Sequence, residues 1–297
     1  MSHARAVSLM VLVTLLWSLA GVVSRHLDTA QSFEVTFWRS ACNAVALGIA
    51  LTVLRGPSFW SRLAHSSRVV WISGVCWSVM FTAFMVAITL TTVANVLVTM
   101  ALGPLMTALF ARIFLHHQLA RRTWAAIAVA GLGIGWMFGQ DAQSGVSLTG
   151  TLVALAVPVA AAINFTVLQH VGHNKEDDEA SVDMLPAVFI GAVISAAVTL
   201  PLAWPLKASL HDVGLLAFLG AVQLALPCLL VVRLSRELPA PEIALLGLLE
   251  VIFGVAWAWL GAGEAPTSST LVGGVLVLGA LVANEVSLLG TRQKVAT

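Results

Sequence analysis

Two charged side chains inside long apolar runs are the residues best placed to do chemistry. Glu250 stands in the middle of LLGLLEVIFG, residues 245–254. An acidic side chain at the centre of a membrane helix costs about 2.5–3.5 kcal/mol on insertion scales, so it is expected to face a cavity or a partner. Glu250 could bind a proton or the amine of a small molecule. Alternatively, it is a structural carboxyl group that is protonated or hydrogen-bonded to a neighbouring helix end.

Arg39 is the second charge of this kind, and it lies about two turns into the apolar run 33–54. An arginine at this depth could clamp a carboxylate, because a guanidinium group binds it through two parallel hydrogen bonds. The simpler alternative is that the long side chain reaches the membrane surface. Glu34 precedes Arg39 by five residues, which is not an ideal spacing for an ion pair within one helix.

Uncharged polar, aromatic and helix-breaking residues at mid-depth complete a candidate substrate cavity. Amides and hydroxyls offer acceptors for an ammonium group and donors for a carboxylate. Aromatic rings could stack on a substrate side chain, and proline frees a backbone carbonyl. Any single polar residue of this kind more often forms a hydrogen bond between helices than binds a substrate. The candidates are Trp17, Ser18, Asn43, Trp77, Phe81, Asn95, Thr99, Leu102, Pro158, Asn164, Gln223 and Leu246.

The composition requires a membrane to hold these residues. Of 297 residues, 59% are hydrophobic and 10% charged, and the mean hydropathy is +0.95. Soluble domains carry about 25% charged residues, so this chain cannot cover a soluble surface. The net charge of +1 suggests no nucleic-acid partner. The three cysteines form no CxxC pair and are expected to serve packing.

Ten apolar runs are long enough, or nearly so, to cross a bilayer as helices. They fall near 7–24, 33–54, 69–90, 93–115, 124–138, 148–168, 184–203, 213–232, 242–261 and 268–289. With the N-terminus in the cytoplasm, cytoplasmic segments hold eleven basic residues and external loops hold only Arg25 and Lys207. Because cytoplasmic loops are enriched in lysine and arginine, both termini are predicted to be cytoplasmic.

The two halves of the chain repeat. A shift of 147 positions places VTMALGPLMT (98–107) on LLGLLEVIFG (245–254), and each half has five apolar runs. Since five is odd, the second half enters the membrane from the opposite side. This predicts an all-α membrane protein with two inverted five-helix repeats, residues 1–140 and 141–297, around a central cavity. The polar segment 169–183 is predicted to be a solvated cytoplasmic hinge between halves, and the alternative is a partner or cation site at its acidic cluster, residues 176–179.

Several stretches resemble the EamA-type members of the drug/metabolite transporter superfamily. They are LLWSLAGVVSR (15–25), EVTFWRSACNAVAL (34–47), AITLTTVANVLVTMALGPLMT (87–107) and EIALLGLLEVIFGVAWAWLGAGEAP (242–266). Glu250 and Gly263-Glu264 match the family pattern, whereas Val251 replaces its proline and His116-His117-Gln118 replaces the terminal glutamate of the first half. Within this superfamily, the chain as a whole resembles aromatic amino acid exporters of the YddG type. This resemblance implies export of aromatic and other neutral amino acids from a bacterial inner membrane.

Motifs for other chemistries are absent from the sequence. There is no GxxxxGK[ST], HExxH, GxSxG or GxGxxG, so no nucleotide or metal cofactor is implied. With what the resemblance implies, a secondary exporter of amino acids, not an enzyme, is the leading hypothesis, with a small-molecule substrate and the bilayer as partners. The alternatives are the same fold carrying purines, drugs or other metabolites, and a membrane enzyme or receptor that transports nothing. The oligomeric state stays open, with a monomer possible.

Overall fold

The computed structural model describes residues 2–114, 119–144, 148–173, 185–234, 237–238, 243 and 246–296. Within these residues every regular element is a helix, as the sequence predicts. The helices are α1 (His3–Ser24), α2 (Ser32–Arg55), α3 (Ser58–Ala64), α4 (Arg68–Leu90), α5 (Val93–Met100), α6 (Gly103–Phe114), α7 (Arg121–Ser144), α8 (Leu148–His173), α9 (Leu185–Ala203), α10 (Leu210–Phe218), the π-helix η1 (Leu219–Ala225), α11 (Leu226–Leu234), α13 (Leu249–Ala262) and α14 (Ser268–Ala296).

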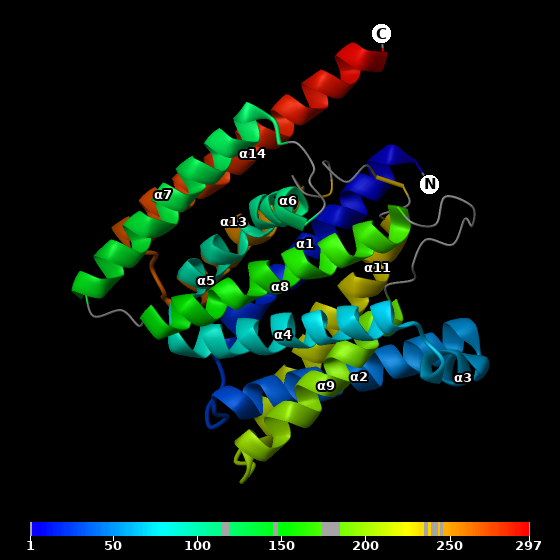
Figure 1. Cartoon of the computed structure of the whole chain (residues 1–297). Coiled ribbons are helices and arrows are strands. Elements are labelled where there is room, and N and C mark those ends of the chain that lie inside the picture. Colours follow the sequence, from blue (N-terminus) through cyan, green and yellow to red (C-terminus); the bar gives the residue numbers. More distant parts are fainter. Residues whose placement is uncertain are drawn as a thin grey trace.

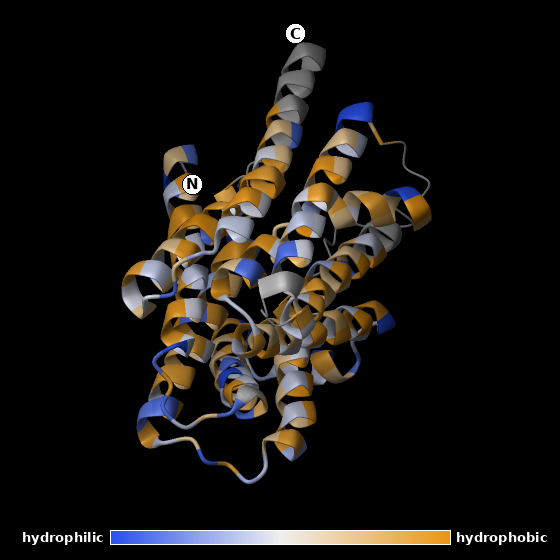
Figure 2. Ribbon diagram, turned by 90° about the vertical axis from the view of Figure 1, so that its left-hand side faces the viewer, coloured by the Kyte–Doolittle hydropathy of each residue, from blue (hydrophilic) through white to orange (hydrophobic). Residues whose placement is uncertain are grey.

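Seven of these segments are long and apolar enough to cross a membrane, which confirms a multi-pass membrane protein. They are His3–Ser24, Phe33–Arg55, Arg68–Leu90, Val93–Phe114, Leu148–Val167, Leu185–Ala203 and Leu210–Val231. The apolar helices Leu249–Ala262 and Ser268–Asn284 are shorter, and α7 is not among the seven. In Figure 2, apolar residues run along the helices, whereas hydrophilic residues gather at helix ends and in the links.

The helices of the two halves interlock. In Figure 1, α4 lies between α8 and α9, and α7 and α14 run side by side at the edge of the bundle. The packing also recurs between halves. The contact of α4 with α8 corresponds to that of α11 with α1, and the contact of α6 with α8 corresponds to that of α13 with α1. Equivalent segments of the two halves therefore occupy equivalent surroundings.

Two of the predicted spans are interrupted at equivalent places. The fourth span breaks at Ala101–Leu102, between α5 and α6, where Pro104 stands in the first turn of the new helix. Leu248, which lies 147 positions after Ala101, is a turn residue directly before α13. The prediction that Glu250 lies at the centre of the ninth helix is therefore wrong, because Glu250 is in the first turn of α13.

Other expectations about local structure have mixed outcomes. Pro158 lies inside α8, which continues as one helix through residue 173. The eighth span, where Gln223 and Pro227 interrupt the apolar run, contains the π-helical turn η1. The predicted hinge 169–183 is wrong at its start, because α8 extends to His173. Residues 174–183 and the segment His116-His117-Gln118 lie outside the described residues.

Candidate functional site

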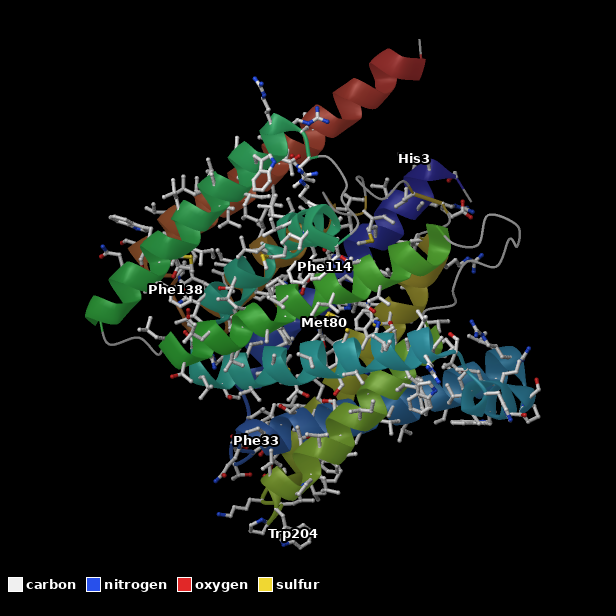
Figure 3. The ribbon with its side chains drawn as sticks, viewed as in Figure 1. His3, Phe33, Met80, Phe114, Phe138 and Trp204 are labelled. Carbon is white, nitrogen blue, oxygen red and sulfur yellow. The ribbon has the colours of Figure 1, made fainter. Side chains whose placement is uncertain are left out.

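A cavity of about 180 Å³ lies between the helices of both halves. Six predicted residues meet there although they lie far apart in the sequence: Trp17, Arg39, Trp77, Phe81, Gln223 and Glu250. Six further lining residues were not predicted: Met80, Phe84, Met100, Val157, Leu224 and Cys228. Figure 3 shows Met80 on α4 among the inner helices, while Phe33 and Trp204 lie at the outside of the bundle.

Arg39 is the buried cation of this cavity. Its side chain is 2% exposed, so the prediction that it might reach the membrane surface is wrong. Its Nε and Nη2 atoms donate to Oε1 of Gln223 at 3.3 and 3.0 Å. Nη1 has no hydrogen-bond partner among the described residues, and the guanidinium carbon lies 5.5 Å from the centre of the Phe84 ring. The guanidinium group of Arg39 therefore contacts a neutral amide and an aromatic face, and its Nη1 atom is available to a ligand.

The π-helical turn η1 positions Gln223. Pro227 lacks the N–H that an α-helix would donate to the carbonyl of residue 223, and the Leu226 N–H instead bonds Ala221. A Cβ atom at Gly220 would lie 2.6 Å from the carbonyl oxygen of Arg39, so glycine is needed where η1 crosses α2. Nε2 of Gln223 donates to the carbonyl of Trp17 at 2.9 Å, which fixes the amide orientation. π-helical turns of this kind are frequent at functional sites.

Glu250 supplies an acidic group to the same cavity. It stands in the first turn of α13, where the helix dipole favours negative charge. No ion pair between described residues joins it to Arg39. A guanidinium group and a carboxyl group thus line one apolar cavity without direct contact.

Aromatic and sulfur-containing side chains form most of the remaining wall. The rings of Trp77 and Phe81 are tilted by 39° with centroids 5.5 Å apart. The Nε1 atom of Trp77 is buried and has no partner among the described residues. Met80 and Phe84 follow Trp77 at helical spacing on α4, so extending the predicted face by one turn would have found them. This wall offers apolar contact and one N–H donor.

Eight predicted residues lie away from the cavity lining. Ser18 donates to the carbonyl of Leu15, and Thr99 donates to that of Asn95, so both bond their own helix. The side-chain oxygen of Asn95 accepts from Thr270 on α14. Such bonds within and between helices are the common role of polar residues in membrane proteins.

The other non-lining candidates are apolar or buried without a described partner. Leu102 belongs to the apolar core, Leu246 packs at the edge of another cluster, and Pro158 is internal to α8. The side-chain amides of Asn43 and Asn164 are buried, and neither atom pair finds a partner among the described residues. Their burial has no physical explanation in the described contacts.

Arg25 and Glu264 join four elements at one end of the bundle, here called the Glu264 end. Nε of Arg25 lies 2.6 Å from Oε2 of Glu264, and its Nη atoms donate to the carbonyls of Ile88 and Thr91 at 2.7 and 2.8 Å. The other oxygen of Glu264 accepts from the backbone N–H of Val93. The ends of α1, α4 and α13 are thereby held to the start of α5.

A second set of carboxylates joins links of the two halves at the same end. Asp212 of α10 accepts from the backbone N–H groups of Asp28, Thr29 and Ala30 at 2.8–3.0 Å. Glu34 of α2 accepts from the N–H groups that follow α9, at residues 207 and 208. Each carboxylate of one half therefore anchors a loop of the other.

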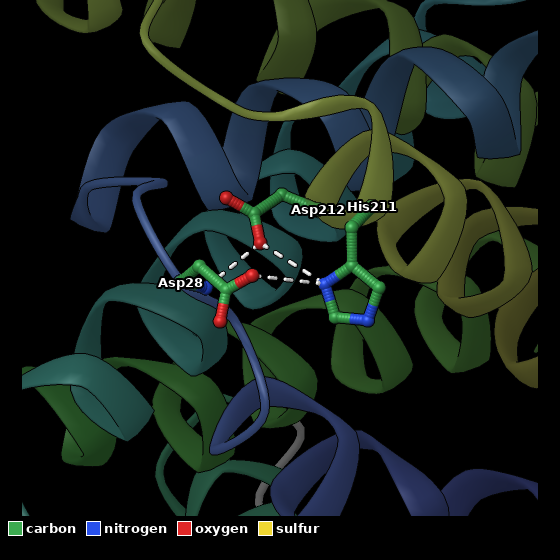
Figure 4. A group of neighbouring side chains, drawn as sticks. All are labelled: Asp28, His211 and Asp212. Carbon is green, nitrogen blue, oxygen red and sulfur yellow. Dashed lines mark hydrogen bonds and ion pairs between the residues drawn. The ribbon is translucent and has the colours of Figure 1, made fainter.

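His211 completes this group on the outside. Its Nδ1 lies 3.3 Å from Oδ2 of Asp28 and 3.8 Å from Oδ1 of Asp212, as Figure 4 shows. The three residue types are those of metal sites, and their ligand atoms lie within 4.8 Å of one another. However, backbone N–H groups already bind the buried carboxylate of Asp212, so its burial requires no metal ion. Asp28 and His211 are exposed. An ion pair at the bundle surface explains the arrangement without a metal.

Comparison with known proteins identifies the family. The model of the EamA-like transporter family matches residues 4–139 and again residues 148–284. The chain belongs to the EamA-like transporter family. This family lies in the drug/metabolite transporter superfamily that the resemblance indicated, and its members are membrane transporters. The double match confirms that the chain consists of two repeats.

Individual relatives differ in what they carry. The chain is 24% identical over 258 residues to the pseudopaline exporter CntI of Pseudomonas aeruginosa, covering 86% of each chain. It is 27% identical over 262 residues to an S-adenosylmethionine uptake transporter of Rickettsia conorii, covering 86% of this chain and 84% of the relative. A crystal structure of another protein superposes with a TM-score of 0.61 at 18% identity, covering 98% of this chain and 99% of that one. This last likeness concerns the fold alone.

Proposed function

We propose that the protein is a secondary exporter of neutral amino acids, including aromatic ones, in a bacterial inner membrane. The observation that carries this proposal is the pairing of a buried arginine with a carboxylate in one apolar cavity. Arg39 offers a free N–H donor to a carboxylate, and Glu250 offers an acceptor to an ammonium group. Between them, the rings of α4 provide the surface for an apolar side chain.

The size of the cavity favours a small solute. Sites for drug-sized molecules have volumes of about 300–1,000 Å³, whereas this cavity has about 180 Å³. An amino acid uses both charged groups of the site, while a purine or a cationic drug would leave Arg39 without an anion. An unpaired buried charge costs free energy that a bound carboxylate would offset.

The repeat supports movement by alternating access. We infer ten membrane spans in two inverted five-helix units, residues 1–140 and 141–297, because the packing pairs recur between halves. Interrupted helices at corresponding positions of two repeats mark the substrate site in many transporters. Here the breaks at Ala101 and Leu248 lie beside the lining residues Met100 and Glu250. The excess of basic residues at the end that carries α3 supports cytoplasmic termini.

A second candidate is export of larger amino acid derivatives by the same site. The two named relatives handle pseudopaline and S-adenosylmethionine, and the second of these contains an α-amino carboxylate. Such a substrate would use Arg39 and Glu250 in the same manner. It would also require the cavity to widen beyond its present volume.

Counterflow in proteoliposomes tests the proposal. Proteoliposomes that contain the purified protein are preloaded with unlabelled tryptophan, phenylalanine, threonine, S-adenosylmethionine, a nucleobase or a quaternary ammonium drug. Entry of the same solute in labelled form is then measured. Saturable exchange of the neutral amino acids is expected. Exchange of only S-adenosylmethionine would favour the second candidate, and exchange of only the nucleobase or drug would refute the amino acid assignment. Folded protein that exchanges none of them would refute transport of all these classes.

A further inference from the structure

A second, larger concavity lies on the outer surface of the bundle, away from the central site. Its volume is about 510 Å³, and its walls come from α2, α3 and α9. The lining is almost wholly apolar and strongly exposed, with Val53 at 78%, Val45 at 62% and Ile49 at 61%. The full lining is Ala44, Val45, Gly48, Ile49, Thr52, Val53, Trp60, Phe189 and Val193. Because α2 and α9 are membrane spans, this groove opens toward lipid.

Three aromatic rings pack together at one end of the groove, and two of them, Trp60 and Phe189, line it. Phe59 and Trp60 of α3 meet Phe189 of α9, with every pair of rings close to perpendicular and centroids 5.4–6.4 Å apart. The indole N–H of Trp60 donates to the hydroxyl of Thr52 at 3.1 Å. This contact fixes the ring as a wall of the groove. Edge-to-face packing of this kind is a favourable, defined geometry rather than a loose cluster.

A basic cavity of about 440 Å³ adjoins the other side of these rings. It is lined by Arg55, Phe59, Arg62, Leu63, Ser66 and Pro186. Gly56, with φ +72°, makes the turn that directs α3 away from the end of α2 and brings both arginines to this cavity. Nη2 of Arg62 donates to the hydroxyl of Ser58 at 3.0 Å, which holds the guanidinium group beside the turn.

The two cavities follow one seam of the bundle. Along α9, Pro186 lines the basic cavity, while Phe189 and Val193 line the apolar groove on the next turns. Along α2, ten residues separate Val45 in the groove from Arg55 in the basic cavity. Ten helical residues rise about 15 Å, which is half of a hydrocarbon core of about 30 Å. The seam therefore has the length of one membrane leaflet, with positive charge at its outer end.

We propose that this seam is a binding site for one anionic phospholipid. The acyl chain lies in the groove against Trp60 and Phe189, and the phosphate group of the lipid binds Arg55 and Arg62. A guanidinium group binds phosphate through directed, charge-assisted hydrogen bonds. A basic cavity at the end of an apolar groove requires an occupant that is anionic at one end and apolar at the other. Anionic lipids are enriched in the cytoplasmic leaflet, where basic residues near the surface attract them.

Quenching of Trp60 by brominated lipids tests the site. The full chain is reconstituted in phosphatidylcholine bilayers that contain a brominated-chain lipid, either phosphatidylglycerol or phosphatidylcholine, at equal low mole fractions. The signal of Trp60 is obtained by subtracting that of the Trp60→Phe variant. We expect phosphatidylglycerol to quench Trp60 at a lower mole fraction, by about fivefold for each arginine that binds the phosphate. Equal quenching by the two lipids would overturn the proposal, whatever the variants do.

Charge variants then locate the headgroup. The double variant Arg55→Gln/Arg62→Gln should lose the preference for phosphatidylglycerol. The matched control Arg68→Gln/Arg121→Gln removes the same charge from the same end of the bundle but touches neither cavity, and it should keep the preference. Loss of the preference in both double variants would mean general surface attraction and would overturn the site. Size-exclusion profiles confirm that each variant is folded before quenching is compared.

Discussion

Replacement of Arg39 by methionine should remove recognition of the substrate carboxylate. Two of the three guanidinium nitrogens already bond Gln223, so a bound carboxylate has one free nitrogen, Nη1. One hydrogen bond to a charged group contributes about 1.5–3 kcal/mol, or roughly 10- to 150-fold in affinity. We therefore expect wild-type protein to prefer phenylalanine over phenylalaninamide, which lacks the carboxylate, by about that factor. Arg39→Met should bind the two compounds almost equally.

Competition against labelled tryptophan in counterflow measures this preference directly. The ratio of the two inhibition constants cancels any general loss of activity in the variant. Arg112→Met is the matched control, because Arg112 also lies within a span, on α6, but does not line the cavity. Arg39→Lys keeps the charge without the planar fork and should retain part of the preference. The reasoning is refuted if Arg39→Met discriminates between phenylalanine and its amide as strongly as the wild type.

Three further changes probe the site and its supports. Glu250→Gln should make amino acid flux independent of a pH gradient, since the amide cannot take up a proton; an unchanged pH profile in active protein would exclude proton coupling through this residue. Gly220→Ala should lower the melting temperature, because its Cβ would lie 2.6 Å from a backbone oxygen of α2 and overpacking costs about 1–3 kcal/mol; Gly214→Ala, which meets nothing within 4 Å inside α10, should not lower it, because alanine is the better helix former. Glu264→Gln should destabilise the protein by about 1.5–3 kcal/mol by removing the charge that pairs with α1, as measured by denaturant titration in detergent. A melting temperature unaffected by Gly220→Ala would show that η1 and α2 can separate enough to admit a methyl group. A titration midpoint unaffected by Glu264→Gln would show that the charge of Glu264 does not stabilise the fold.

The sequence predicted the class of protein and the charged part of the cavity. Arg39, Gln223 and Glu250 were found because a polar side chain in an apolar run is costly and so stands out. The same reasoning selected Thr99, which bonds its own helix, and Asn95, whose side chain accepts from α14. The free-energy cost of a polar residue in an apolar run indicates that the residue has a partner or faces a cavity. Only the tertiary structure shows which of the two applies.

The apolar part of the site and the course of the helices were harder to predict. Val157 and Cys228 look like any core residue in the sequence, since apolar lining outside the aromatic face of α4 carries no local signal. The break in the fourth span could be anticipated from Gly103 and Pro104, whereas the equivalent break before Leu249 lies in a run of leucines. Its position is set by packing between helices rather than by local propensity. The shift of 147 residues between halves is the one sequence feature that could have located it.

The contacts at the Glu264 end have a consequence for how easily that end can come apart. Arg25, Glu34, Asp212 and Glu264 hold it through separate hydrogen bonds between a charged side chain and backbone groups. Each such bond contributes about 1.5–3 kcal/mol, because one of its partners is charged. If apolar side chains closed this end instead, opening it would expose their whole buried surface to water in one step. The Glu264 end can therefore open one hydrogen bond at a time, so the free-energy barrier to its opening is divided into separate steps.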